Sequence, residues 1–155
     1  MNNDNNIPFQ TIDWTTIPKT EHKGESGSAF WQTVQLPGLR IRLVEYSKGY
    51  LADHWCRKGH IVHCLEGEFT SELENGDKFT LTKGMTYVVT DNLSSHRSTT
   101  KDGVKVMIID GDFLKQKEYN ILFALVLIML PYQNKLHPVV RSALSNGSLG
   151  RQLRI

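Results

Sequence analysis

Two histidines and one cysteine lie within seven residues of one another in the segment DHWCRKGH, residues 53–60. His54, Cys56 and His60 offer two imidazole nitrogens and a thiolate sulfur, which are ligands for transition metals such as zinc, iron or nickel. In an extended chain His54 and Cys56 point to the same face, because side chains alternate along a strand. A turn through residues 57–59 then brings His60 beside them. The spacing therefore predicts three ligands that converge on one divalent metal ion.

A fourth ligand is expected from outside this segment. His96, in TDNLSSHRSTT, precedes the last predicted strand and could complete the site from across the sheet. By the same alternation of side chains, His63 is out of phase with His60, and Trp55 is out of phase with Cys56. Both are therefore expected to point away from the metal. The predicted ligands are His54, Cys56, His60 and His96.

Three further side chains could line a pocket near the metal: Arg42, Tyr87 and Cys64. Arg42 shares one face of its strand with Arg40, and we expect this face to be solvated. If it faces the interior instead, one arginine could bind a substrate carboxylate. Tyr87 is equally consistent with core packing. Cys64 is in phase with His60 and is expected to fill the core, with a role beside the metal ligands as the alternative.

These side chains need a scaffold, and residues 30–112 supply short β-rich runs separated by Gly, Asn and Asp. The runs are FWQTVQL, GLRIRLVEYS, HIVHCLEGEFTSEL, DKFTLT, MTYVVT and VKVMIID. Asn75-Gly76 is the best hairpin signal among the breaks. The pattern predicts an all-β domain over residues 30–115, either a sandwich or a barrel. Residues 1–29 are expected to form an N-terminal arm laid over this domain.

The end of the chain differs in character from the β-rich region. Within the extension 116–155, the run NILFALVLIML, residues 120–130, is almost wholly apolar and is followed by Pro131. It is shorter than the roughly 20 residues that a membrane-spanning helix needs. We expect a C-terminal helix packed on the domain or on a partner subunit, with contact to a membrane surface as the alternative.

Length and charge narrow the classes of function. The 155 residues fit one domain, and 18 basic against 16 acidic residues give a net charge of +2. Without a continuous basic face, nucleic acid is not an expected partner. The first ten residues lack the basic and apolar regions of a secretion signal, so a cytoplasmic location is expected. In this reducing compartment the two cysteines are expected to be thiols or metal ligands rather than a disulfide.

The segment around the candidate ligands resembles the first sequence motif of cupins, G-x5-H-x-H-x3,4-E-x6-G. Gly49, His54, Cys56, His60 and Gly67 take its positions. Cys replaces the second His, His replaces the Glu, and one residue fewer follows the first Gly. The second cupin motif matches in a degraded form, in which the histidine at position 96 takes the place of the motif's histidine.

The chain is most similar to a subgroup of small single-domain proteins, the DHCW-motif cupins. Their signature corresponds here to residues 53–56, and the resemblance covers about residues 7–114, whereas nothing in 116–155 matches. The resemblance implies a cupin double-stranded β-helix, also called a jelly-roll barrel, in which the four predicted ligands hold a divalent transition metal. We expect the protein to be a homodimer.

The ligands predicted here carry the same total charge as the ligands of the usual cupin site. Three neutral histidines and one glutamate carry a charge of −1 in the usual cupin site, and three histidines and one cysteine thiolate carry the same charge. A divalent ion then leaves a net charge of +1. Such a site favours an anionic oxygen ligand from a small molecule or from water.

We therefore expect a metal-binding cupin that binds or transforms a small polar or anionic molecule. If the protein is an enzyme, its metal could support oxygenation, isomerisation or hydrolysis. One alternative is a non-catalytic ligand- or metal-binding module in which four ligands close a structural zinc site. Another alternative is a redox sensor based on the Cys56 thiol.

Overall fold

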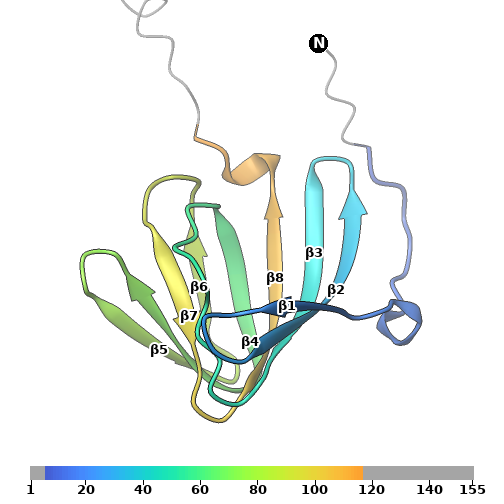
Figure 1. Cartoon of the computed structure of the whole chain (residues 1–155). Helices are drawn as coiled ribbons and strands as arrows, with labels where there is room; N and C mark the ends of the chain where they lie inside the picture. The colour runs from blue at the N-terminus through green and yellow to red at the C-terminus, as the bar shows by residue number, and fades with distance from the viewer. Residues whose placement is uncertain (1–5, 117–155) are drawn as a thin grey trace, which may run out of the picture. The chain divides into compact units, whose positions relative to one another are not determined.

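The computed structural model describes residues 6–116, which form a β-rich unit (Figure 1). The predicted C-terminal helix and the proposed contacts of the apolar run 120–130 lie outside the described residues. Among the described residues, no helix has the length and apolar character needed to cross a bilayer.

The strands form two antiparallel sheets that share the long strand β4. Sheet A contains β1, β2, β3, β8, the first half of β4 and β6, and sheet B contains the second half of β4 with β5 and β7. In Figure 1, β5 and β7 lie on one side of β4, whereas β8, β3 and β2 lie on the other. The strands are β1 (Thr20–Lys23), β2 (Ser28–Leu36), β3 (Leu39–Tyr46), β4 (His60–Leu73), β5 (Lys78–Thr82), β6 (Thr86–Val89), β7 (His96–Thr99) and β8 (Val104–Gly111).

A bulge in β4 lets this strand pass from one sheet into the other. The register with β8 shifts between Cys64 and Glu66, and Gly67 follows with a φ of 81°. A Cβ at residue 67 would lie 2.7 Å from the carbonyl oxygen of Gly103. Only glycine combines this left-handed conformation with so close an approach of two backbones. The bend closes the two sheets around a common interior.

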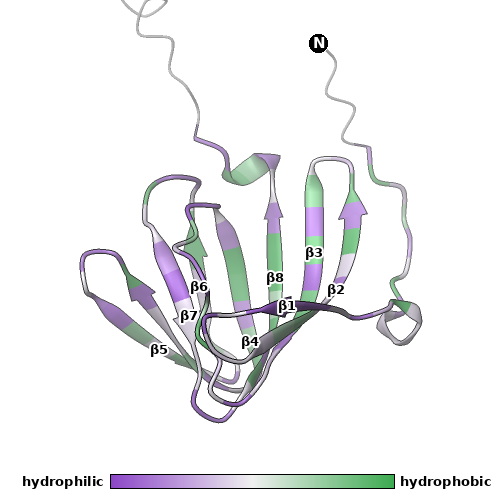
Figure 2. Cartoon of the chain, in the orientation of Figure 1, coloured by the Kyte–Doolittle hydropathy of each residue, from purple (hydrophilic) through white to green (hydrophobic). Residues whose placement is uncertain are grey.

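The interior of the barrel has an apolar end and a polar end. Burial alternates strictly along β8, where each inward residue from Val104 to Asp110 is buried. Figure 2 shows that β8 is hydrophobic over most of its length, whereas hydrophilic bands cross β3. The apolar end is filled by fully buried side chains: Val44, Cys64, Phe69 and Val106. The polar end contains four buried residues that carry titratable groups or charges: Arg42, His60, His96 and Asp110.

The predicted strands agree with the structure, with two omissions. Each of the six β-rich runs contains a strand, and Gly76 takes a φ of 94° in the predicted hairpin between β4 and β5. The expected N-terminal arm, residues 1–29, includes β1 and the start of β2, so part of it belongs to sheet A. β7 was not predicted as a strand, because its residues HRST are polar and lack an alternating pattern.

The segment before β1 is fastened to the outside of sheet A. A short 3-10 helix, η1 (Trp14–Thr16), is capped by the side chain of Asp13, which accepts a hydrogen bond from the backbone of Thr15. The side-chain amide of Gln32 on β2 donates to the carbonyl oxygens of Trp14 and Ile17, at 2.5 and 2.7 Å. A second 3-10 helix, η2 (Asp112–Leu114), follows β8.

Candidate metal centre

Cys56, His60 and His96 form a group whose potential ligand atoms all lie within 4.8 Å of one another. The Sγ of Cys56 lies 3.2 Å from the Nε2 of His60, and the two imidazole rings meet edge to face with centroids 5.5 Å apart. Ligands of zinc lie about 2.0–2.3 Å from the ion, so neighbouring ligand atoms are separated by about 3–4 Å. The donor atoms and their spacing therefore fit a first-row transition metal.

Backbone pairing holds two of these residues side by side. The N–H of Cys56 donates to the carbonyl oxygen of His96 at 2.8 Å, and the N–H of His96 donates to the carbonyl oxygen of Cys56 at 3.0 Å. Residues that exchange both backbone hydrogen bonds carry their side chains on the same face of the ladder. His96 is also paired with Leu73 of β4, so the bridge connects Cys56 to sheet B.

The turn before His60 is fixed by Asp91. One carboxylate oxygen of Asp91 accepts a hydrogen bond from the N–H of Gly59 at 2.5 Å, and the other lies 3.0 Å from the Nζ of Lys58. A Cβ at residue 59 would lie 2.6 Å from the backbone nitrogen of Asp91. The close approach of these two segments requires glycine at position 59, and it sets the direction in which His60 enters β4.

The two imidazole rings of the group differ in how their Nδ1 atoms are held. The Nδ1–H of His96 donates to the carbonyl oxygen of Ser94 at 2.9 Å, which selects the tautomer with a free lone pair on Nε2. The Nδ1 of His60 is buried without a hydrogen-bond partner among the described residues, and a carboxylate oxygen of Asp110 lies 3.6 Å from it. The Nε2 of His60 lies beside Cys56, where it can act as a metal ligand.

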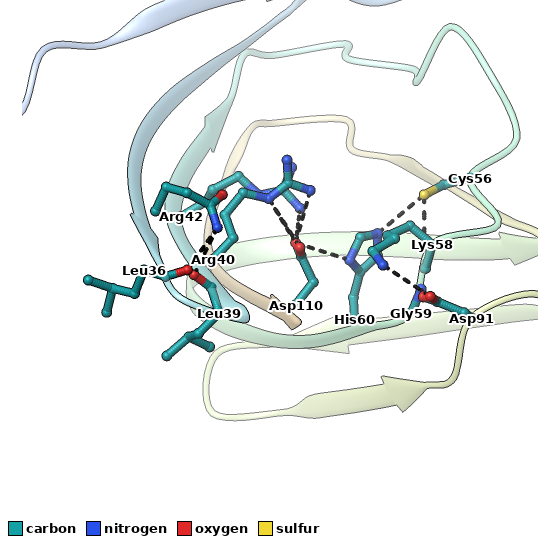
Figure 3. Close-up of polar contacts among 11 residues, drawn as sticks. Leu36, Leu39, Arg40, Arg42, Cys56, Lys58, Gly59, His60, Asp91 and Asp110 are labelled. Atoms are coloured by element: carbon teal, nitrogen blue, oxygen red, sulfur yellow. Dashed lines mark hydrogen bonds and ion pairs between the residues drawn. The ribbon is translucent and has the colours of Figure 1, made fainter. Parts of the chain in front are cut away.

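Asp110 is the centre of a buried charge network behind His60 (Figure 3). Its carboxylate lies 3.1 Å from the Nε of Arg40 and 2.7 Å from an Nη of Arg42. The side chains of Arg42 and Asp110 are each only 5% exposed. Figure 3 shows Asp110 between the arginines and one edge of His60, with Cys56 at the opposite edge of the ring. The network thus lies against the edge of His60 that faces away from Cys56.

The expectation of a solvated face for Arg42 was wrong. Arg42 lies on β3 opposite Ile108 of β8, on the face that points into the barrel. Its guanidinium carbon lies 4.7 Å from the ring centroid of Trp31, a cation–π contact. Burial of this charge is compensated by Asp110 and by the aromatic ring. Asp110 itself was missed, although the alternation in VKVMIID places it in phase with the inward-facing residues of that run.

Burial and charge set the protonation of the group. Burial raises the pKa of the Cys56 thiol, which disfavours a free thiolate. Burial lowers the pKa of His60, so its ring is neutral at pH 7 and can bind a metal. Burial alone would raise the pKa of Asp110, but the neighbouring His60, Arg40 and Arg42 outweigh it and hold this pKa well below its usual range. The network therefore contains a carboxylate, two guanidinium cations and a neutral imidazole.

The structure does not bring His54 into the group. Its side chain is 70% exposed, and its Nδ1 pairs with a carboxylate oxygen of Asp53 at 2.6 Å. The alternation argument requires an extended chain, but the backbone bends at residues 53–54. Consequently His54 and Cys56 do not share a face. Of the four predicted ligands, the structure brings together Cys56, His60 and His96.

The other candidate residues lie around the group in different ways. Cys64 has no solvent exposure and belongs to the hydrophobic core. His63 points to the opposite face of β4 from His60, and its Nδ1 lies 2.8 Å from the hydroxyl of Thr86. The ring of Trp55 lies under the guanidinium of Arg97 at 4.5 Å. These placements agree with the expected directions of Cys64, His63 and Trp55.

A cavity of about 230 Å³ opens beside His96. The ring of Tyr87 meets the ring of His96 edge to face, with centroids 5.7 Å apart, so Tyr87 lines this cavity next to the metal-ligand group. Burial raises the pKa of Tyr87, which is therefore a neutral phenol at pH 7. The cavity takes most of its lining from inward-facing residues of both sheets: Ser71, Leu73, Phe79, Tyr87, Val89 and His96.

Comparison with known proteins establishes the fold. No family model and no curated protein matches the sequence. An ectoine synthase from P. lautus is similar in structure, with a TM-score of 0.56 and 17% identity over 70% of this chain and 80% of that chain. An RmlC-like cupin from Shewanella frigidimarina NCIMB 400 has a TM-score of 0.54 and 17% identity over 69% and 91% of the two chains.

A third similar structure is a sugar phosphate isomerase of the cupin superfamily, from Silicibacter pomeroyi DSS-3. Its TM-score is 0.53, with 12% identity over 66% of this chain and 75% of that chain. At such low identity these likenesses show the architecture only. The described part of the chain therefore has the jelly-roll β-barrel of cupins, as its sequence motifs predict.

Proposed function

We propose that this cupin binds a divalent transition metal through Cys56, His60 and His96, and that it binds or transforms a small anionic molecule at the metal. The observation that carries this proposal is the convergence of the three ligand atoms within 4.8 Å at the polar end of the barrel. Three protein ligands with a further position open to water or substrate are typical of catalytic rather than structural metal sites.

The surrounding residues support an open and positively charged site. The carbonyl oxygen of Ser94 holds the imidazole of His96 by its Nδ1, and the Asp110 carboxylate lies 3.6 Å from the Nδ1 of His60. One thiolate, from Cys56, leaves a net charge of +1 on a bound divalent ion, which favours an anionic oxygen ligand. A metal in this place would supply Lewis-acid chemistry to that ligand.

Two rival functions have less support from the described residues. A closed zinc site needs a fourth protein ligand, but the imidazole of His54 is exposed and paired with Asp53. A thiol sensor needs a reactive thiolate, but burial raises the pKa of Cys56. We propose an open metal site on these grounds.

We also propose that the chain belongs to the DHCW-motif cupins. The four residues of the signature segment lie in three different surroundings. Asp53 pairs with His54, and Trp55 stacks under a guanidinium. Cys56 belongs to the metal-ligand group. The support for this assignment is the resemblance of the sequence over about residues 7–114.

Elemental analysis of protein purified without added metal tests the proposal. We expect about one equivalent of a transition metal in the wild type and in His54→Ala, and loss of that metal in His60→Ala and His96→Ala. X-ray absorption should then show a mixed nitrogen and sulfur shell with an added oxygen ligand. A wild-type protein without metal, or a His54→Ala variant without metal, would contradict this ligand set. A shell made only of four protein ligands would instead establish the closed zinc site.

We further propose a homodimer formed through the outer face of sheet A. A row of aliphatic side chains crosses five paired strands on this face: Val88, Ile61, Ile109, Ile41 and Val34. Val88 is 65% exposed, which supports burial against a second copy. Sedimentation should give a dimer for the wild type and for the control Thr80→Lys, and a folded monomer for Ile109→Lys. A monomeric wild type would contradict this proposal.

A further inference from the structure

We propose that the cavity beside His96 binds the apolar part of a small monocarboxylate, whose charged end lies toward Cys56, His60 and His96. This inference rests on the proposed metal site, because the positive charge of that site is what attracts the carboxylate. It adds a substrate class, an orientation and a set of side chains that determine specificity.

The cavity lies where β5 and β6, which follow one another along the same edge of β4, belong to different sheets. Within residues 6–116, β5 and β6 each pair with β4 and not with each other. Phe79 of β5 lies opposite Ser71 on sheet B, and Val89 of β6 lies opposite His60 on sheet A. The cavity is therefore a gap between the two sheets, and it leads from the surface to a residue of the metal-ligand group.

The lining divides the cavity into a polar inner end and an apolar outer part. Leu73, Phe79 and Val89 form apolar walls, and no Asp, Glu, Lys or Arg of the described residues lines the cavity. At the inner end His96 lies beside the ring of Tyr87. A charge buried without a partner is costly, so a ligand can place its charge only at the inner end. The walls thus select a molecule with one charged end and an uncharged body.

The volume limits the size of the whole ligand, its carboxylate included. At about 30 Å³ for each water-sized group, a cavity of about 230 Å³ holds about eight non-hydrogen atoms. Hexanoate has this number of atoms. Each methylene buried on binding raises the affinity about fourfold. Affinity should therefore rise with chain length and then level off once the cavity is filled.

Phe79 provides a variant that keeps the fold. Its side chain is at the rim of the cavity and is 53% exposed, so Phe79→Ala shortens one wall without emptying the core. Phe113 is a matched control, because it is 58% exposed and lies on η2, away from the cavity lining. Neither variant changes a proposed metal ligand.

The experiment measures binding of acetate, butyrate, hexanoate, decanoate and uncharged hexanol to metal-loaded protein, by calorimetry and by amide NMR shifts. We expect at least tenfold tighter binding of hexanoate than of acetate, no further gain for decanoate, and shifts at Tyr87 and Val89. Phe79→Ala should weaken hexanoate about threefold to tenfold and leave acetate within about twofold, whereas Phe113→Ala should change neither. Hexanol should bind more weakly than hexanoate.

Two outcomes separate this inference from the metal site on which it rests. If the metal is bound but acetate and hexanoate bind equally, or the shifts map elsewhere, the cavity is not the pocket and the metal site stands. If no metal binds, the proposed function fails, and hexanoate binding no tighter than hexanol would then overturn the inference as well.

Discussion

Cys56 and Cys64 lie eight positions apart in the sequence but at opposite ends of the barrel interior. Cys64 is completely buried among apolar side chains, and its Sγ lies near the carbonyl oxygens of Glu66 and Gly67. Cys56 is partly exposed, and its Sγ lies 3.2 Å from the Nε2 of His60. A cysteine side chain therefore packs in the hydrophobic core at one end, and another is a candidate metal ligand at the other.

The difference between the two ends follows from what surrounds each sulfur. At the apolar end the side chains packed in the same cluster include Val44, Phe69 and Val106, which offer no metal ligand and no charge. At the polar end the Asp110 carboxylate pairs with Arg40 and Arg42, beside the imidazoles of His60 and His96. A barrel with one packed end can keep polar groups at the other end, because the packed end provides the burial that stabilises the fold.

The largest effect on this contrast is expected from Asp110→Asn. Loss of the carboxylate charge leaves the Arg42 guanidinium buried without its partner, which should lower the free energy of unfolding by about 3–5 kcal/mol. Urea unfolding at pH 7 measures this change. The control is Glu45→Gln, which removes exposed ion pairs with Lys19 and Lys105 and should cost less than about 1 kcal/mol. Equal losses in the two variants would mean that the polar end is not a coupled network.

The same carboxylate makes the polar end sensitive to acid. The pKa of Asp110 is lower in the folded protein than the value of about 3.9 typical of an unfolded chain. Its contribution to stability is therefore complete above the unfolded pKa and is lost as the pH falls through the folded pKa. Urea unfolding in the presence of a chelator, from pH 7 down to pH 3, should show a shallower decline for Asp110→Asn than for the wild type. Parallel declines would contradict the lowered pKa.

Metal affinity should distinguish the two cysteines directly. Cys56→Ala removes a ligand and should lower the affinity by more than about 100-fold, because loss of even a residue behind a ligand costs 10- to 100-fold. Cys64→Ala should leave the affinity within about twofold. Competition with a chromophoric chelator measures both. A large loss of metal affinity in Cys64→Ala would mean that the metal binds at the apolar end of the barrel, which contradicts the proposed site.

The free energy of unfolding should be more sensitive to substitution at Cys64 than at Cys56, the reverse of the order expected for metal affinity. Cys64→Ala removes a fully buried sulfur and leaves a void among apolar side chains, which should destabilise the metal-free protein by about 1–3 kcal/mol. Cys56→Ala should cost less than about 1 kcal/mol, since this side chain is partly exposed. Urea unfolding with a chelator present provides the comparison. A greater loss at Cys56 would show that this side chain is structural.

Much of the scaffold could be predicted from local patterns, because strand alternation and turn residues are encoded within short windows. The convergence of Cys56 with His60 was also predictable, since only a short turn separates them. The position of His54 was not, because its prediction assumed an extended backbone at residues 53–54, where the chain bends. His96 required the cupin resemblance, since no local pattern links it to residue 56.

The charge network behind His60 could not be predicted from the sequence alone. Arg40 and Asp110 are separated by 70 positions, and their contact depends on the pairing of β3 with β8. Local hydrophobic patterns do not specify which strands become neighbours. The alternation of VKVMIID did indicate that its last aspartate faces inward, and a buried acid on a strand was the signal that a cationic partner had to exist.

The absorption spectrum of the cobalt-substituted protein tests the central claim most directly. Cobalt bound by a thiolate has an intense sulfur-to-metal charge-transfer band in the near ultraviolet. We predict this band for the wild type and for Cys64→Ala, and its loss in Cys56→Ala. A spectrum without the band in the wild type, or a band that disappears with Cys64 and survives the loss of Cys56, would contradict the assignment of Cys56 as the metal-binding cysteine.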